Sequence, residues 1–151
     1  MACEANSRSI LVTGATGFVG GGLALALAGS GTHVRCLVRE AGRAKHLSAA
    51  GCEVVEGDVM RATTLEGVGR DIHTAYYLIH AMAGGDGFQQ REQDGARNFA
   101  QMARREGIGR VVYLGGLGDQ SVSKHLLSRH RTAMTLAEHG PPLTYFRAAM
   151  V

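Results

Sequence analysis

Three glycines at intervals of three follow a short apolar run, as Gly14, Gly17 and Gly20 in Val-Thr-Gly-Ala-Thr-Gly-Phe-Val-Gly. The first glycine would allow a tight turn, and the second would let backbone N–H groups approach a phosphate. The third would let the following helix pack closely. A helix that begins here also offers partial positive charge to an anion. The spacing therefore predicts a phosphate-binding turn, although a glycine-rich loop without a ligand remains the alternative until its context is known.

A second candidate, Arg39, ends an apolar run about twenty residues after the glycines, where a site for NAD carries an acid that binds the ribose 2′-hydroxyl. A guanidinium instead suits a 2′-phosphate and can stack on adenine, so Arg39 favours NADP(H) over NAD(H). Arg43 could assist it. In the alternative interpretation Arg39 is solvated and Glu40 binds the ribose.

Two further polar residues follow apolar runs, Asp58 in Gly-Asp-Val and His80 in Leu-Ile-His. Asp58 could accept a hydrogen bond from the adenine amino group, cap the short helix expected after it, or do both. His80 would pass beneath the ribose and pyrophosphate. It could contact the cofactor there or serve only as an orienting group hydrogen-bonded to backbone.

Six apolar runs and five helical patterns alternate along the chain. We expect strands at 9–13, 32–38, 52–56, 71–79, 110–114 and 143–147, and helices at 18–30, 41–50, 63–68, 88–106 and 123–139. This alternation predicts an α/β fold: a doubly wound (Rossmann) parallel sheet with strand order 3-2-1-4-5-6 and helices on both faces. Ligands bind outside the carboxyl ends of such strands, where the glycines, Arg39, Asp58 and His80 all fall. The context turns the glycine motif into a predicted dinucleotide site.

Composition excludes several other classes. The 151 residues suit one domain, 1–151, and the net charge of +3 is spread among acids, which argues against nucleic-acid binding. Three cysteines and seven histidines show no metal-ligand spacing, so we expect no metal site, and Cys36 and Cys52 read as buried free thiols. No apolar stretch approaches the length of a membrane span, and the N-terminus is unlike a signal peptide. The expected location is cytoplasmic.

In combination, these motifs resemble the extended and atypical short-chain dehydrogenase/reductase superfamily, and most closely its NmrA-like NAD(P)H-binding members. The resemblance rests on Thr13–Gly20, Leu37–Arg39, Gly57–Val59 and Leu78–Ala81, and it covers nearly the whole chain. It implies that backbone of the glycine turn meets the pyrophosphate, that Asp58 and Val59 flank adenine, and that Arg39 meets the 2′-phosphate. The expected cofactor-binding residues are Gly14, Ala15, Thr16, Gly17, Phe18, Val19, Arg39, Asp58, Val59, Leu78, Ile79 and His80.

The usual catalytic residues of that superfamily are missing. Active members carry a Ser or Thr after the fifth strand and then Tyr-x-x-x-Lys, whereas this chain has Gly115-Gly116 and no Tyr between positions 113 and 145. The best surrogate is His125 with Arg129, four residues apart on one helix face. His125 could donate a proton and Arg129 could hold a ribose or a substrate anion. Alternatively, both lie on a solvated or phosphate-facing surface.

Neighbouring hydroxyls on the same segment, those of Ser121, Ser123 and Ser128, read as helix caps or surface residues rather than nucleophiles.

The end of the sequence is a second departure. Members of the superfamily continue after the sixth strand into a smaller lobe that shapes the substrate pocket, and this sequence ends at Val151, so we expect the cofactor-binding domain without that lobe. An exposed sheet edge or the cofactor cleft could support a homo-oligomer.

Three functions remain open at this point. The first is an NADP(H)-dependent oxidoreductase that transfers hydride to a small carbonyl-type substrate. The second is a non-catalytic NADP(H)-binding sensor or scaffold of NmrA-like type. The third is a nucleotide-sugar epimerase-like isomerase.

Overall fold

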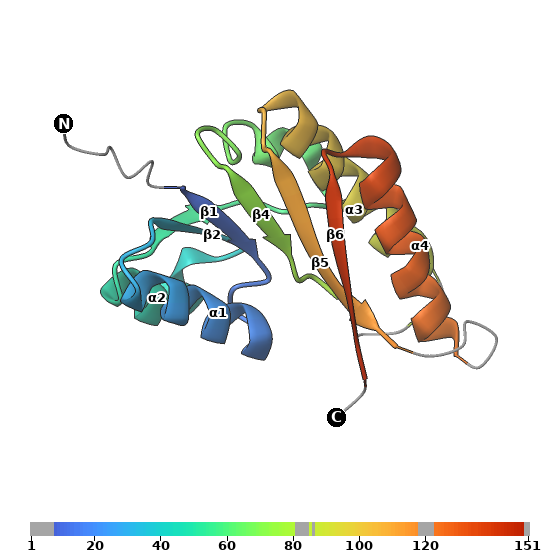
Figure 1. Ribbon diagram of the computed structural model, residues 1–151, viewed down its shortest axis with the longest axis horizontal. Coiled ribbons are helices and arrows are strands. Elements are labelled where there is room, and N and C mark those ends of the chain that lie inside the picture. Colours follow the sequence, from blue (N-terminus) through green and yellow to red (C-terminus); the bar gives the residue numbers. More distant parts are fainter. Residues whose placement is uncertain (1–7, 81–84, 86, 118–122, 150–151) are drawn as a thin grey trace.

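One parallel sheet of six strands forms the centre of the computed structural model, which describes residues 8–80, 85, 87–117 and 123–149 (Figure 1). Its strands are β1 (Ile10–Thr13), β2 (Val34–Val38), β3 (Glu53–Glu56), β4 (Thr74–Tyr77), β5 (Arg110–Gly116) and β6 (Leu143–Ala148). They lie in the order β3-β2-β1-β4-β5-β6, and every neighbouring pair is parallel. The predicted fold class and strand order are therefore confirmed.

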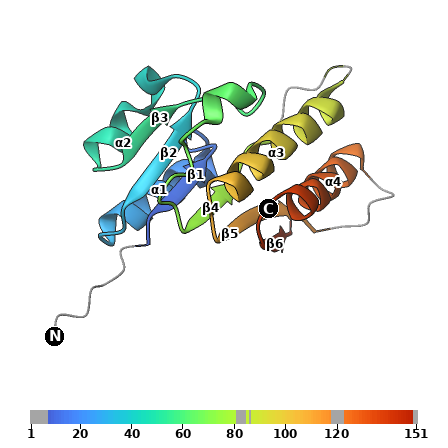
Figure 2. The same ribbon diagram turned by 90° about the horizontal axis from the view of Figure 1, so that it is seen from above.

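Helices cover both faces of this sheet, as the sequence predicts. On one side lie α1 (Phe18–Gly29) and α2 (Lys45–Ala49), and on the other α3 (Phe88–Arg105) and α4 (Lys124–His139) (Figure 2). The helix expected at 41–50 divides into the 3-10 turn η1 (Ala41–Ala44) and α2, and the one expected at 63–68 is the 3-10 turn η2 (Ala62–Leu65). Within the described residues, no helix combines the length and the hydropathy that crossing a membrane requires.

The two faces bury separate apolar clusters because successive side chains of a strand point to opposite sides. Under α3 and α4 lie Phe99, Met102, Tyr113 and Leu136, together with other residues of the larger cluster. The cluster under α1 and α2 is smaller and includes Val12, Ala24, Cys36 and Leu47. Phe99, Met102 and Ala103 form an apolar stripe along α3 that is fully buried.

Two thiols belong to the smaller cluster. Cys36 and Cys52 are free and buried, as expected, while Cys3 lies outside the described residues. Burial, together with the neighbouring Cys52, raises the pKa of the Cys36 thiol to about 12. A thiol with such a pKa is almost entirely protonated at neutral pH and is a poor nucleophile.

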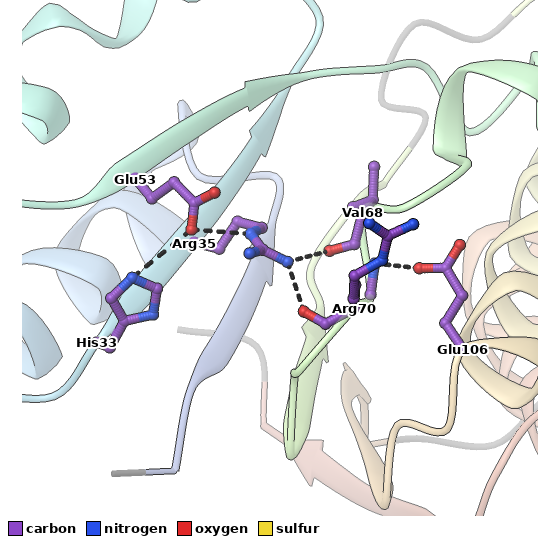
Figure 3. A network of polar contacts seen from close by, with 7 residues as sticks. His33, Arg35, Glu53, Val68, Arg70 and Glu106 are labelled. Carbon is purple, nitrogen blue, oxygen red and sulfur yellow. Dashed lines mark hydrogen bonds and ion pairs between the residues drawn. The ribbon is translucent and has the colours of Figure 1, made fainter.

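Arg35 links β2 to two other segments near the end of the sheet at which the strands begin (Figure 3). Its Nε donates to Glu53 Oε2 at 2.9 Å. Its Nη1 donates to the carbonyl oxygens of Val68 and Arg70, each at 2.9 Å. The loop that precedes β4 is thereby fastened to β2 and β3. This brace stands at the end of the sheet remote from the glycine turn.

Candidate functional site

A cleft of about 550 Å³ opens at the carboxyl ends of the strands. It lies where the strand order reverses between β1 and β4, which is the place at which doubly wound sheets bind ligands. The residues that line it come from the glycine turn, the ends of β2 to β4, and helices α3 and α4: Gly14, Thr16, Gly17, Leu37, Val38, Arg39, Gly57, Asp58, Val59, Met60, Tyr77, Leu78, Ile79, His80, Arg91, Glu92, Gly95 and Thr132. The structure thus brings most of the predicted cofactor-binding residues to one surface.

The glycine turn approaches neighbouring backbone too closely for a side chain. Gly14 has φ of +69°, and a Cβ there would lie 2.6 Å from the carbonyl oxygen of Leu78. A Cβ on Gly20 would collide with the carbonyl of Gly14, so the third glycine lets α1 start directly against the turn. Both positions therefore require glycine for the turn to keep its shape.

Thr13 fixes this turn against the end of β4. Its buried hydroxyl donates to the carbonyl of Tyr76 at 3.0 Å and accepts from the N–H of Leu78 at 3.2 Å. One side chain thus holds the carboxyl ends of β1 and β4 at a set separation, and the cleft lies just beyond them.

The first turn of α1 offers N–H groups to the cleft. Gly17 is the N-cap, and a glycine has no side chain that could accept a hydrogen bond from that turn. The N–H groups at the start of a helix have no acceptor within the helix, so an uncapped first turn is suited to an anion. Phe18 is 98% exposed and leaves this end of the helix open. These residues fit the pyrophosphate of a dinucleotide.

Arg39 and Asp58 lie farther along the same cleft, at the ends of β2 and β3. Arg39 is exposed, as a residue that binds a phosphate would be. Asp58 Oδ1 accepts from the N–H of Met60 at 2.9 Å and so closes a tight turn two residues long. The N-cap of η2 is Arg61, without a side-chain hydrogen bond, so the predicted capping of the following helix by Asp58 is wrong. The side-chain amide of Asn98 on α3 donates to the carbonyl of Val59 at 2.8 Å and anchors the loop that carries Asp58.

At the other end of the cleft, α3 and α4 contribute polar groups that the sequence reasoning did not identify. The hydroxyl of Ser128 donates to the Glu92 carboxylate across the two helices. Ser128 is only 1% exposed, so its interpretation as a cap or surface residue is wrong. Ser123 does cap α4, accepting from the N–H of His125 at 3.2 Å, and Ser121 lies outside the described residues.

His80 lies among these groups, after β4. Its ring centroid is 5.9 Å from that of Tyr113, and the imidazole donates a hydrogen bond to the carbonyl of Leu114. Burial is the main cause that lowers the pKa of His80, and the charge of Arg129 lowers it further, while Glu92 acts in the opposite direction.

Tyr113 adds a second buried polar atom beside His80. Its hydroxyl is close to Thr132 but has no well-aligned hydrogen-bond partner among the described residues. Burial, reinforced by the charge of Glu92, raises the pKa of this phenol well above its usual range, so it stays protonated at neutral pH.

The structure separates the two members of the predicted surrogate pair. His125 is exposed, and its ring lies beside that of Phe88, tilted by 36° with centroids 5.3 Å apart. Arg129 is half-buried and turns toward β5, where a Cβ on Gly116 would lie 3.5 Å from its Nη1. Arg129 therefore acts electrostatically on His80, a residue that is distant in sequence.

Comparison with known proteins places the chain in a family. A family model described as NAD(P)H-binding matches residues 14–142, which is most of the sequence. The chain belongs to this NAD(P)H-binding family. The family model supports dinucleotide binding in general and leaves the choice between the two cofactors open.

Individual relatives of the NAD(P)H-binding chain are longer than it is. Sterol demethylase protein B of Methylococcus capsulatus is 33% identical over a match 138 residues long. The match covers 86% of this chain and 41% of that protein. Among solved structures, Citrobacter sp. triphenylmethane reductase complexed with NADP(H) has a TM-score of 0.80 at 21% identity, over 93% of this chain and 49% of that one.

The Bordetella bronchiseptica enzyme WbmG in complex with NAD has a TM-score of 0.79 at 18% identity, over 97% and 55%. The chain thus spans about half the length of these relatives, and the structural likenesses establish the fold. Because one of these two complexes contains NADP(H) and the other NAD, the fold alone does not select a cofactor.

Proposed function

We propose that this chain is the NADP(H)-binding domain, residues 1–151, of an oxidoreductase that transfers hydride between NADP(H) and a small carbonyl-type substrate. The observation that carries the proposal is the cleft that joins the N-terminus of α1, whose N-cap is a glycine, to an exposed arginine at the end of β2. The turn would hold the pyrophosphate, Arg39 the 2′-phosphate, and Asp58 with Val59 the adenine. The bound cofactor would supply or accept the hydride.

Arg39 carries the preference for NADP(H) within this proposal. A guanidinium forms charge-assisted, bidentate hydrogen bonds with a phosphate, whereas NAD(H) offers only a hydroxyl at that position. Such a bond contributes about 1.5–3 kcal/mol, which corresponds to roughly ten- to hundredfold in affinity.

The test is calorimetric titration of the protein with NADPH, NADP⁺, NADH and NAD⁺. We expect the two phosphorylated cofactors to bind more tightly, and Arg39→Asp to weaken NADPH by roughly ten- to hundredfold while weakening NADH far less. Arg104→Asp, at the far end of α3, is the matched control and should leave all four affinities unchanged. Tighter binding of NADH than NADPH by the unmodified protein would contradict the preference, and no binding of any dinucleotide would contradict the whole proposal.

Sterols are the first substrate class to examine, because the relative with 33% identity is named a sterol demethylase protein. A sterol carries a secondary hydroxyl group, which is chemically the reduced form of a ketone. Incubation with NADP⁺ and cholesterol, followed at the absorbance of NADPH, tests this choice directly.

A second candidate is a non-catalytic NADP(H) sensor or scaffold. Two observations favour it: Gly115-Gly116 replaces the expected hydroxyl residue at the end of β5, and His125 is exposed against Phe88. This alternative requires NADPH binding with no NADPH consumption in the presence of any carbonyl substrate, whereas the oxidoreductase requires both.

A further inference from the structure

His80 is held at the end of the cleft where α3 and α4 meet the sheet. It lines the cleft, its ring lies against Tyr113, and one ring nitrogen donates its proton to the carbonyl of Leu114. In a neutral imidazole the other nitrogen then carries no proton and is an acceptor.

The charged groups around His80 come from every element packed against it. Arg129 contributes a positive charge from α4 and Glu92 a negative one from α3, while Arg91 lines the same cleft and Tyr113 on β5 remains a neutral phenol. Part of the hydrogen-bonding capacity of Glu92 is taken by the buried hydroxyl of Ser128. With burial and Arg129 both opposing protonation, the imidazole is neutral at pH 7 and can accept a proton.

We propose that His80 is the group that accepts and returns the proton of a substrate hydroxyl in this cleft, with Arg129 as its neighbouring cation. The proposal rests on the proposed oxidoreductase function. As a secondary alcohol is oxidised, its O–H proton passes to the free nitrogen of His80 and its C–H hydride leaves for the oxidised cofactor, which produces a ketone. Reduction runs these transfers backwards, with the imidazolium returning the proton to oxygen.

This assignment differs from the pair inferred from sequence. In the superfamily pattern that this chain resembles, a base and a cation lie four residues apart on one helix. Here the cation Arg129 stands on α4, whereas the histidine whose pKa it lowers is at the end of β4, 49 positions earlier. His125 is directed to the surface, where Phe88 covers one side of its ring.

The first test measures the pKa of the His80 imidazole by proton–nitrogen NMR during a pH titration. The signal of His80 is assigned by its loss in His80→Gln. We expect the pKa of His80 to lie below 6.5 and to rise in Arg129→Met. A pKa at or above 6.5, or one that Arg129→Met leaves unchanged, would overturn the proposal.

The second test follows NADP⁺-dependent oxidation of cholesterol and cyclohexanol between pH 5 and 9. We expect kcat/KM to fall as the pH drops through the pKa found by NMR, and His80→Gln to lower kcat by about a hundredfold or more. His46→Gln, an exposed histidine on α2, is the control. A loss in His125→Gln with full activity in His80→Gln would overturn the assignment. Failure of the unmodified protein to bind NADP(H) would instead contradict the proposed function.

Discussion

At the scale of single residues, contacts with backbone atoms, rather than with side chains, decide which residues the glycine turn accepts. Gly14 combines a left-handed φ with an approach to the Leu78 carbonyl that leaves no room for a methyl group. Both features penalise any other residue, and they act together because the strained conformation also directs the Cβ at Leu78.

Gly14→Ala is accordingly expected to lower the free energy of unfolding by about 2–4 kcal/mol, from the left-handed backbone and the overlap with Leu78. Urea denaturation measures this change. Gly22→Ala is the control: nothing lies within 4 Å of a Cβ at that helical position, so alanine should raise the stability by about 0.5–1 kcal/mol. Equal stability of the two variants would contradict the steric role given to Gly14.

Several functional candidates were accessible to sequence reasoning because each follows a strand directly. The glycines, Arg39, Asp58 and His80 occupy strand ends, and the sheet topology alone brings strand ends together. The dinucleotide cleft could therefore be predicted without knowledge of side-chain packing.

Glu92 and Ser128 could not be found in this way. Each looks like a solvated helical residue when its own helix is considered, and their hydrogen bond depends on how α3 packs against α4. Ser128 and Thr132 are small polar residues one helical turn apart, and they are buried on α4 together with Ala133 and Leu136. Their spacing indicates a polar stripe but does not reveal its partner.

At the scale of elements, the strands and helices were predicted to within a few residues because their apolar patterns are long and bounded by glycines. The 41–50 segment was the least accurate, since Ala41–Ala44 closes as a tighter turn before α2 begins. The side chain that links β2 to the loop before β4 was not predicted, because Arg35 reads as an ordinary outward-facing strand residue.

Arg35→Met tests this brace. Methionine keeps much of the apolar stem but removes the hydrogen bonds to Glu53, Val68 and Arg70, so the free energy of unfolding should fall by about 1–3 kcal/mol. Arg97→Met is the matched control, since Arg97 forms an exposed 3.5 Å ion pair with Asp94. This substitution should change the free energy of unfolding by less than about 0.5 kcal/mol. Chemical denaturation of both variants gives the comparison. Neither variant should change the affinity for a dinucleotide, because Arg35 lies near the amino ends of the strands and the cleft lies at their carboxyl ends.

At the scale of the whole molecule, His80 couples folding to pH. Its pKa is lowered in the folded protein by burial and by Arg129, so the unfolded chain binds a proton more readily. The pKa of a histidine in the unfolded chain is about 6.5. Above that pH, His80 costs the folded protein no stability, and below it the free energy of unfolding falls as the pH drops.

Urea denaturation at pH 7.5 and pH 5.5 should therefore show a smaller free energy of unfolding at the lower pH. In His80→Gln the difference in the free energy of unfolding between the two pH values should shrink, and in His46→Gln it should remain, since His46 is exposed on α2. An identical pH dependence in all three proteins would show that His80 is not a buried neutral base.

The contact between Gly14 and Leu78 has a further consequence, for the evolution of this turn. The glycine meets a main-chain carbonyl, which every amino acid supplies, so the constraint acts on one partner only. Position 14 is confined to a single residue, whereas position 78 is free to drift among residues that fit its own side-chain surroundings. Divergent descendants of such a sequence can therefore lose most of their identity and still keep the glycine turn, without any compensating exchange at the residue it touches.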